Sequence, residues 1–237
     1  MIKEAIILAG GLGTRLQSVV SDVPKCMAPV AGKPFLHYVI GFLKKNGTDH
    51  FIFSVGYMHE MIEEYLAGNY PQLNYTISSE NEPLGTGGAI KLACNKCIEK
   101  TVLICNGDTL YKIDFSLLNE LHVDVNAACT LNLKPLNYFD RYGVVQLNQD
   151  HSVRSFKEKK YYKSGLINGG IYALNVEEFS KENLPEKFSF EKDYLEENVN
   201  QSTNEKSKIY GIIQDKYFID IGIPEDYQRA QIELLKD

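Results

Sequence analysis

Several features that would place this chain in a common class of protein are missing from its sequence. No apolar run approaches the length of a membrane-spanning helix, and Met1 leads into an apolar stretch with no charged segment before it. Basic residues number 25 against 31 acidic ones, and the formal net charge of −6 argues against a nucleic-acid-binding protein. We therefore expect a cytoplasmic protein that binds neither membrane nor nucleic acid. The net charge does not exclude a local basic pocket that binds an anion.

Paired cysteines are also scarce. The five cysteines are an odd number, and only Cys94 and Cys97 form a C-x-x-C pair, on one face of a predicted helix. A zinc or redox site would need a second cysteine or histidine pair, and none accompanies them. A segment from His59 to Glu63 superficially resembles a zinc-protease motif but lacks its second histidine. We expect reduced core thiols in a reducing compartment.

The first turn is rich in glycine but matches neither common nucleotide-binding motif. An apolar run at 5–9 predicts a buried strand, and Gly10, Gly11, Gly13 and Arg15 follow it. A leucine replaces the third small residue of the dinucleotide fingerprint, and no G-x-x-x-x-G-K-[ST] occurs. A tight turn into a helix would explain the glycines alone. Exposed backbone amides beside an arginine would also suit a polyphosphate.

Strands and helices alternate through the first half of the chain. Apolar runs predict strands at 5–9, 51–55, 75–77 and 101–105, and helical periodicity predicts the segments between them, the last helix running through Cys97. This alternation indicates a parallel, doubly wound α/β sheet. Ligands bind such sheets at the carboxyl ends of the strands. We expect loops 10–16, 80–88 and 106–108 to meet there.

The second half of the chain has a different pattern. Short strands with few helices between them are predicted at 125–133, 142–147, 153–157 and 170–174. Residues 188–199 are compatible with a helix, and residues 208–213 and 218–221 are predicted to form two short strands. Pro224 opens a final helix with acidic residues in its first turn. This half predicts a mixed or antiparallel region added to the parallel sheet.

Two aspartates end predicted strands. Asp108 follows Asn106-Gly107, which is also good turn chemistry, while Asp220 lies between two isoleucines, where a charge needs a partner or an ion. Carboxylate and phosphate oxygens are the ligands that Mg²⁺ prefers. Arg15 and Lys25 are the natural contacts of a triphosphate, although a lone lysine is more often simply solvated.

Blocks spread along nearly the whole chain resemble the sugar-1-phosphate nucleotidyltransferase family. They follow in the family's order from residue 3 to 230, at 8–16, 24–25, 83–88, 106–108, 158–159, 168–170 and 220–227. The resemblance implies a Rossmann-like three-layer α/β/α fold with a mostly parallel mixed central sheet and a small antiparallel sugar-binding subregion. It implies one nucleotidyltransferase domain over 1–237, with a nucleotide-binding half at 1–124 and a sugar-phosphate-binding half at 125–237.

The resemblance also implies a reaction, in which a nucleoside triphosphate and a sugar 1-phosphate give a nucleotide sugar and pyrophosphate. The attacking phosphate is ionised near neutral pH because its second pKa is ~6, so no side-chain nucleophile or general base is needed. Catalysis would rest on positioning and charge neutralisation by Arg15, Lys25 and Asp108. Mg²⁺ would be held by Asp108 and Asp220. The other implied nucleotide contacts are Leu8, Ala9, Gly10, Gly11, Gly13, Thr14, Glu80, Gly85 and Thr86.

The same resemblance implies where the sugar phosphate binds. Lys159 would hold its phosphate, and the sugar hydroxyls would meet Gly143, Glu158, Asn168 and Gly170. Residues 157–160 taken alone would instead read as a solvated, charged strand end. The chain departs from the family at Lys160, where proline is common, and at 17–19, which replace Pro-Leu-Thr.

Glu80 indicates the base. It lies five residues before Gly85, where uridylyl and thymidylyl members of the family carry glutamine. A carboxylate only accepts hydrogen bonds, so it suits the adjacent N1–H and N2–H donors of guanine and repels the carbonyl oxygens of uracil or thymine. An exposed loop glutamate is the alternative. The residue type therefore predicts GTP.

The identity of the sugar rests on the layout of the chain. A short chain with this layout resembles the family's guanylyltransferases for D-glycero-α-D-manno-heptose 1-phosphate. These enzymes serve bacterial surface-polysaccharide synthesis. Three alternatives stay open: mannose 1-phosphate with GTP, a hexose or amino-sugar 1-phosphate with UTP, and a catalytically silent regulatory subunit on the same fold. The oligomeric state is not readable, and a homo-oligomer is compatible with the sequence.

Overall fold

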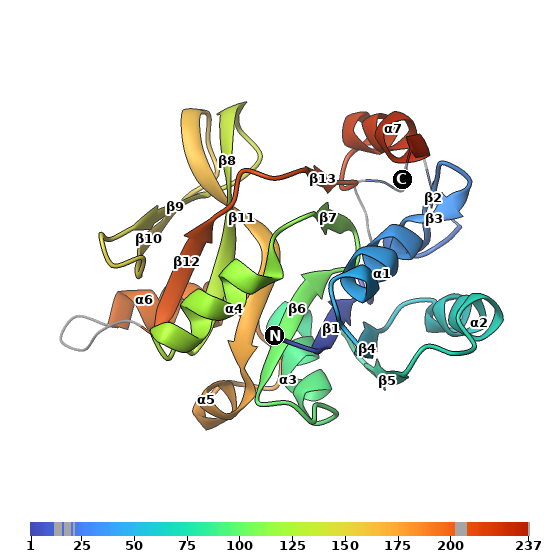
Figure 1. Cartoon of the computed structure of the whole chain (residues 1–237), viewed down its shortest axis with the longest axis horizontal. Helices are drawn as coiled ribbons and strands as arrows, with labels where there is room; N and C mark the ends of the chain where they lie inside the picture. Colours follow the sequence, from blue (N-terminus) through green and yellow to red (C-terminus); the bar gives the residue numbers. More distant parts are fainter. Residues whose placement is uncertain (12–15, 17–19, 21, 202–207, 237) are drawn as a thin grey trace.

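Four parallel strands form one half of a nine-stranded sheet (Figure 1). The computed structural model describes residues 1–236 except 12–15, 17–19, 21 and 202–207, so the predicted site residues Gly13, Thr14 and Arg15 lie outside the described residues. The parallel strands run in the order β6 (Thr101–Asn106), β1 (Glu4–Leu8), β4 (His50–Val55) and β5 (Tyr75–Ser79). Ile6 of β1 lies between Ile104 and Ile52 in register. The predicted parallel sheet is confirmed.

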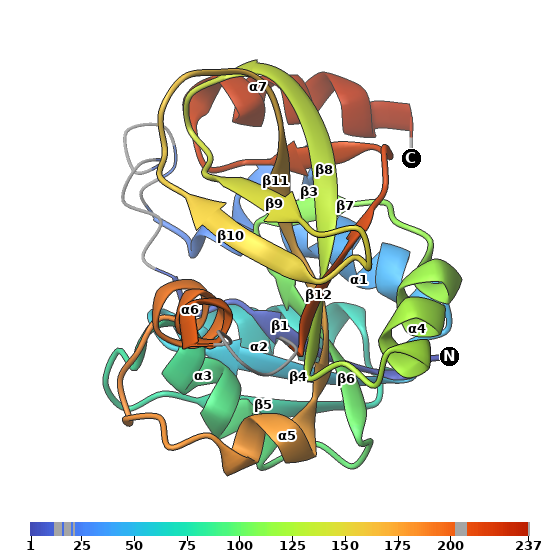
Figure 2. The ribbon, with the colours of Figure 1, turned by 90° about the vertical axis from the view of Figure 1, so that its left-hand side faces the viewer.

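A long antiparallel strand joins the second half of the sheet to the first. This strand, β11 (Tyr162–Asn175), pairs with β6 and with β8 (Cys129–Phe139). It also meets β9 (Val144–Leu147), which pairs with β10 (Val153–Lys157), while β12 (Ile209–Ile213) runs parallel to β8. Figure 2 shows β9 and β10 above the level of β4 and β5. The predicted mixed region is confirmed.

Helices cover both faces of the sheet, because successive strand residues point to opposite sides. Ala5 and Ile7 pack in the core under α1 (Phe35–Lys45), α2 (His59–Asn69) and α4 (Phe115–Asp124). Ile6 packs in the opposite core under α3 (Gly85–Cys94), α5 (Val176–Lys181) and the π-helix η2 (Phe190–Glu196). The expected three layers are therefore present.

Several of the shorter elements lie at the carboxyl end of the parallel strands, whereas α6 packs against η2 and β10. A two-stranded ladder joins β7 (Thr109–Tyr111) to β13 (Phe218–Asp220), and α7 (Pro224–Glu233) follows it (Figure 1). The remaining elements are η1 (Lys25–Met27), β2 (Pro29–Val30), β3 (Lys33–Pro34), α6 (Glu197–Gln201) and η3 (Leu234–Lys236). Across the described part of the chain, no helix combines the length and apolar character that crossing a membrane requires.

Several predicted boundaries are wrong, among them the start of the strand predicted at 170–174, since β11 begins at Tyr162. Helix α3 begins at Gly85, so the loop ends at 84, and it ends at Cys94, before Cys97. The strand predicted at 125–133 begins only at Cys129, a few residues after the unpredicted helix α4, which ends at Asp124 and is capped at its start by the Asp114 side chain. The helix predicted over 188–199 is the π-helix η2 followed by α6.

Gly85 explains the difference at the start of α3. Its φ is +73°, a left-handed conformation that favours glycine, and a Cβ there would lie 2.5 Å from the Phe188 carbonyl oxygen. The segment before η2 therefore packs directly on the first turn of α3. Sequence periodicity carries no signal for such a contact, since Phe188 is far away in the chain.

Candidate active site

The predicted loops meet at the carboxyl edge of the parallel strands. The amide of Ala9 donates to the carbonyl of Ser54 (2.8 Å), and the amide of Gly107 donates to the carbonyl of Leu8 (2.9 Å). These bonds tie together the ends of β1, β4 and β6. Two cavities open here, and Leu8 and Gly11 line both of them. For the described residues of these loops, the predicted convergence is confirmed.

The first cavity, here named the aspartate cavity, gathers residues from both halves of the chain. Its volume is about 400 Å³. Predicted contacts of phosphate, metal and sugar phosphate meet in it, although they come from widely separated segments. The lining residues are Leu8, Ala9, Gly11, Lys25, Cys26, Asp108, Arg141, Tyr142, Lys159, Asp220, Gly222 and Ile223.

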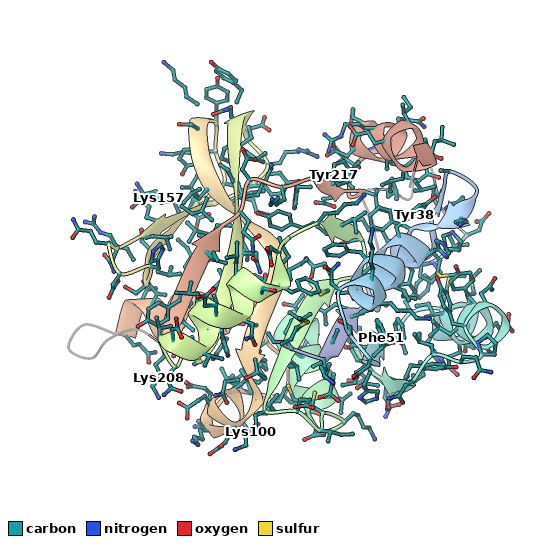
Figure 3. The ribbon with its side chains drawn as sticks, in the orientation of Figure 1. Tyr38, Phe51, Lys100, Lys157, Lys208 and Tyr217 are labelled. Carbon is teal, nitrogen blue, oxygen red and sulfur yellow. The ribbon has the colours of Figure 1, made fainter. Side chains whose placement is uncertain are left out.

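Lys25 lies between the two aspartates. Its Nζ donates to Oδ2 of Asp108 and, at 3.5 Å, to Oδ1 of Asp220. The short turn η1 presents Lys25, and the antiparallel ladder of β7 and β13 places Asp220 opposite Thr109. Tyr217 marks the segment that leads into β13 (Figure 3). The buried charge that the sequence left without a partner at Asp220 therefore has Lys25 beside it.

The charges in this cluster act on one another. Burial lowers the pKa of Lys25, but attraction to Asp108 and Asp220 outweighs it, so the pKa is raised overall. Burial, and then repulsion from Asp108, raises the pKa of Asp220, against the opposing effect of Lys25. Two carboxylates thus share one ammonium. With both carboxylates ionised, the cluster has a net negative charge, which favours binding of a further cation.

The donor set suits Mg²⁺. Asp108 and Asp220 offer hard carboxylate oxygens that one cation can reach together, as Lys25 shows. In the described part of the chain, no group of three or more His, Cys, Asp and Glu side chains could hold a metal. A cation on these two aspartates would therefore complete its shell with water and phosphate oxygens, as Mg²⁺ does with nucleotides. The metal role of the two residues stays a prediction.

The second cavity, here named the Glu80 cavity, has a volume of about 680 Å³. Glu80 is half-buried in its wall, and its Oε2 accepts a hydrogen bond from the Leu84 amide (2.8 Å). Burial raises the pKa of Glu80, and the Leu84 N–H opposes that rise. The exposed-loop interpretation of Glu80 is therefore wrong. The lining residues include Leu8, Gly10, Gly11, Ser54, Gly56, Glu80, Gly85 and Thr86.

Four of the predicted sugar contacts line neither cavity. Glu158 is exposed, and a Cβ on Gly143 would lie 2.5 Å from the carbonyl oxygen of Lys157. Asn168 and Gly170 sit where the pairing of β11 with β8 is interrupted, between Asn168 and Tyr172. Lys159 alone of the predicted sugar-phosphate residues faces the aspartate cavity. The roles of all five stay predictions.

A hydrogen-bond network that the sequence did not reveal connects the two sides of the site. Glu191 of η2 accepts from the hydroxyl of Thr86 (2.9 Å) and from that of Tyr172 (3.5 Å). Tyr172 in turn accepts from Nδ2 of Asn168 (2.8 Å). A predicted nucleotide contact and a predicted sugar contact are thereby linked. Its members come from α3, β11 and η2, three elements far apart in the sequence, so no local motif could have indicated the network.

The cysteines take no part in this chemistry. All five are free, and Cys97 alone among them is not fully buried. Cys26 lines the aspartate cavity, but burial raises the pKa of its thiol to about 12, which keeps it from acting as a thiolate. The expectation of reduced core thiols agrees with this placement.

The comparison with known proteins decides the family. The model of the nucleotidyl transferase family matches residues 4–237. The chain belongs to this nucleotidyl transferase family. The resemblance inferred from the sequence blocks is confirmed, and the chain is a nucleotidyltransferase. The site described above is therefore the candidate active site of such an enzyme.

Three similar proteins come from different bacteria. The D-glycero-α-D-manno-heptose 1-phosphate guanylyltransferase of Aneurinibacillus thermoaerophilus is 53% identical over 98% of each chain. The one of Campylobacter jejuni is 47% identical over 94% of this chain and 96% of its own. The crystal structure of HddC from Yersinia pseudotuberculosis, complexed with GMP-PN, has a TM-score of 0.86 and 35% identity, over 98% of this chain and all of the other. This structural likeness confirms the predicted nucleotidyltransferase fold.

Proposed function

We propose that this protein couples GTP to D-glycero-α-D-manno-heptose 1-phosphate, forming the GDP-heptose and releasing pyrophosphate. The observation that carries the proposal is the 53% identity to a heptose 1-phosphate guanylyltransferase over 98% of both chains. The cluster of Lys25, Asp108 and Asp220 supports it, because it provides the charges that phosphoryl transfer requires. The enzyme would work in the cytoplasm, supplying activated heptose for surface polysaccharide.

The Glu80 cavity suits the guanine base. A half-buried carboxylate at its wall would accept both N1–H and N2–H of guanine. Gly10 leaves space at this point, since a Cβ there would lie only 3.2 Å from Oε1 of Glu80. The Yersinia neighbour is complexed with GMP-PN, which agrees with this assignment. We assign residues 1–124 mainly to GTP and 125–237 mainly to the sugar phosphate.

The aspartate cavity suits the chemical step. An oxygen of the sugar phosphate forms a new bond to the α-phosphorus of GTP, the bond from that phosphorus to the bridging oxygen of the β-phosphate breaks, and pyrophosphate leaves with the electron pair. The attacking phosphate is already ionised near pH 7, since its second pKa is ~6. The described residues therefore need to position the reactants and balance charge rather than remove a proton.

Lys25 is placed to balance negative charge at the α-phosphate. Its ammonium has three N–H donors, of which the described residues take two, through Asp108 and Asp220, and we assign the third to a phosphate oxygen. Asp108 and Asp220 would hold Mg²⁺, which would neutralise phosphate charge when bound. Arg15 would hold the β- and γ-phosphates, and Lys159 the phosphate of the sugar.

A pyrophosphate-release screen tests the proposal. Purified protein is incubated with each of GTP, ATP, UTP and CTP, and with heptose, mannose, glucose and N-acetylglucosamine 1-phosphates. The expected result is the highest kcat/KM for GTP with the heptose phosphate. Faster turnover of mannose 1-phosphate would move the assignment to that sugar, whose guanylyltransferases include a Mycobacterium tuberculosis protein 30% identical to this chain. A preference for UTP would refute the role of Glu80, and no turnover would favour a silent subunit.

A further inference from the structure

Arg141 is a cation of the aspartate cavity to which the sequence blocks assign no role. It lies in the segment between β8 and β9, next to Tyr142, and both residues line the cavity. The hydroxyl of Tyr142 donates to Oδ2 of Asp220 (3.3 Å), and the guanidinium of Arg141 lies 5.4 Å from the centre of the Tyr142 ring. The arginine therefore stands beside the metal-binding carboxylate proposed above.

A buried carboxylate holds this arginine in place. Asp226, in the first turn of α7, is 7% exposed, and its Oδ2 accepts from an Nη of Arg141 at 2.5 Å. The other oxygen, Oδ1, pairs with Arg229 at 2.9 Å. One carboxylate thus binds two arginines, of which only Arg141 lines the cavity. The bond to Asp226 uses part of a fork with five N–H donors, and the Arg141 side chain is still 39% exposed.

The strand register brings Arg141 and Lys159 to the same place. In the antiparallel pair of β9 and β10, Val144 lies opposite Lys157. Arg141 precedes Val144 by a few residues, and Lys159 follows Lys157, so both cations leave the same end of this pair and both line the aspartate cavity. Lys25, by contrast, is already shared by two carboxylates.

We infer that Arg141 binds the phosphate of the sugar 1-phosphate together with Lys159, and that Asp226 is the positioning residue that aims its guanidinium into the cavity. This inference rests on the proposed nucleotidyl transfer but not on the identity of the sugar. A phosphate monoester carries close to two negative charges near pH 7, which two cations match. A planar guanidinium also binds two phosphate oxygens at once, which fixes the orientation of the attacking group.

Kinetics of four variants test the inference, with the sugar phosphate that the wild type turns over fastest. Arg141→Gln is expected to raise KM for the sugar 1-phosphate at least about tenfold, as for other charge-assisted bonds, and to leave KM for GTP within about twofold. Arg141→Lys is expected to give a smaller rise in this KM than Arg141→Gln, because lysine restores the positive charge but not the planar guanidinium that binds two phosphate oxygens. Asp226→Asn gives a smaller rise in the same KM. Arg229→Gln is the matched control, and both KM values stay at their wild-type level.

The outcomes separate this inference from the proposed function. An unchanged sugar-phosphate KM in Arg141→Gln, or an equal rise in both KM values, overturns it, as does the same KM rise in Arg229→Gln. If the wild type turns over no sugar phosphate, the proposed function fails, and calorimetric binding of mannose 1-phosphate tests Arg141 directly. Binding by wild type and Arg229→Gln but not by Arg141→Gln supports the inference. Absence of binding to the wild type, or equal binding by all three, overturns it.

Discussion

Asp220 lies opposite Thr109 in the ladder between β13 and β7, and this register brings its carboxylate close to that of Asp108, the residue before Thr109. Both carboxylates then reach the ammonium of Lys25. A one-residue slip of this short ladder would turn Asp220 to the opposite face. The geometry of the proposed metal and α-phosphate site therefore depends on the pairing of two strands of three residues each.

Removing the Asp220 charge tests the metal assignment. We expect Asp220→Asn to lower kcat about 100-fold or more and to raise the Mg²⁺ concentration needed for half-maximal rate, because one of two charged ligands is lost. Steady-state rates across a Mg²⁺ titration measure both effects. Asp215→Asn, a change to an exposed carboxylate paired with Lys134, is the control and retains wild-type kinetics. Wild-type Mg²⁺ dependence in Asp220→Asn would contradict the assignment.

Changing Glu80 tests base selection. Glutamine has nearly the shape of glutamate, but its amide both donates and accepts, so Glu80→Gln should weaken GTP binding and improve UTP binding. We expect the ratio of kcat/KM for GTP over UTP to fall by about 10- to 100-fold, the range for losing a charge-assisted hydrogen bond. Glu60→Gln, on the exposed side of α2, serves as the comparison. An unaltered ratio would place base recognition elsewhere in the cavity.

Buried His122 makes stability depend on pH. It is 3% exposed, its Nδ1 lies 2.9 Å from the Thr130 hydroxyl, and burial lowers its pKa to about 4. The unfolded chain binds a proton below an ordinary pKa of about 6.5, whereas the folded chain does so only near 4, so stability is lost as pH falls between these values. This group alone accounts for up to about 3 kcal/mol.

Urea unfolding of His122→Gln measures that contribution. Relative to wild type, the variant should lose less stability between pH 7 and pH 4.5, by about 2–3 kcal/mol. The change His151→Asn, at an exposed turn position with φ of 65°, should leave the pH dependence as it is in the wild type. Parallel pH profiles for wild type and His122→Gln would contradict the lowered pKa, because they would mean that His122 binds its proton equally well in the folded and the unfolded chain.

Two glycine substitutions should have opposite effects. Gly85→Ala adds a Cβ to a residue with left-handed backbone conformation, and this Cβ would collide with the Phe188 carbonyl oxygen. We expect the free energy of unfolding to fall by at least about 2 kcal/mol and the KM for GTP to rise, because Gly85 lines the Glu80 cavity. Gly41→Ala, inside α1 with open space around it, should instead add about 0.5–1 kcal/mol. Thermal and urea unfolding give both values. A neutral Gly85→Ala would mean that η2 and α3 separate easily.

Local residue patterns were sufficient to predict the parallel half of the sheet and the loops at its carboxyl edge. Strand and helix periods repeat over a few residues, so the burial of Ile6 or Leu36 can be predicted from its close neighbours in the sequence. The blocks at 8–11, 106–108 and 220–227 directly follow or overlap strands that the same local patterns predict, so the position of their functional residues in the sheet could also be predicted.

Contacts between segments that are distant in the sequence were not predictable and became known from the folded chain. The bond of Arg141 to Asp226, the link of Thr86 to Glu191 and the close approach of Phe188 to Gly85 each join elements distant in sequence. No residue period encodes which partners meet, because their approach follows from strand register and from the packing of whole helices. For that reason the aspartates and lysines could be predicted from their blocks, while the residues that hold them in position could not.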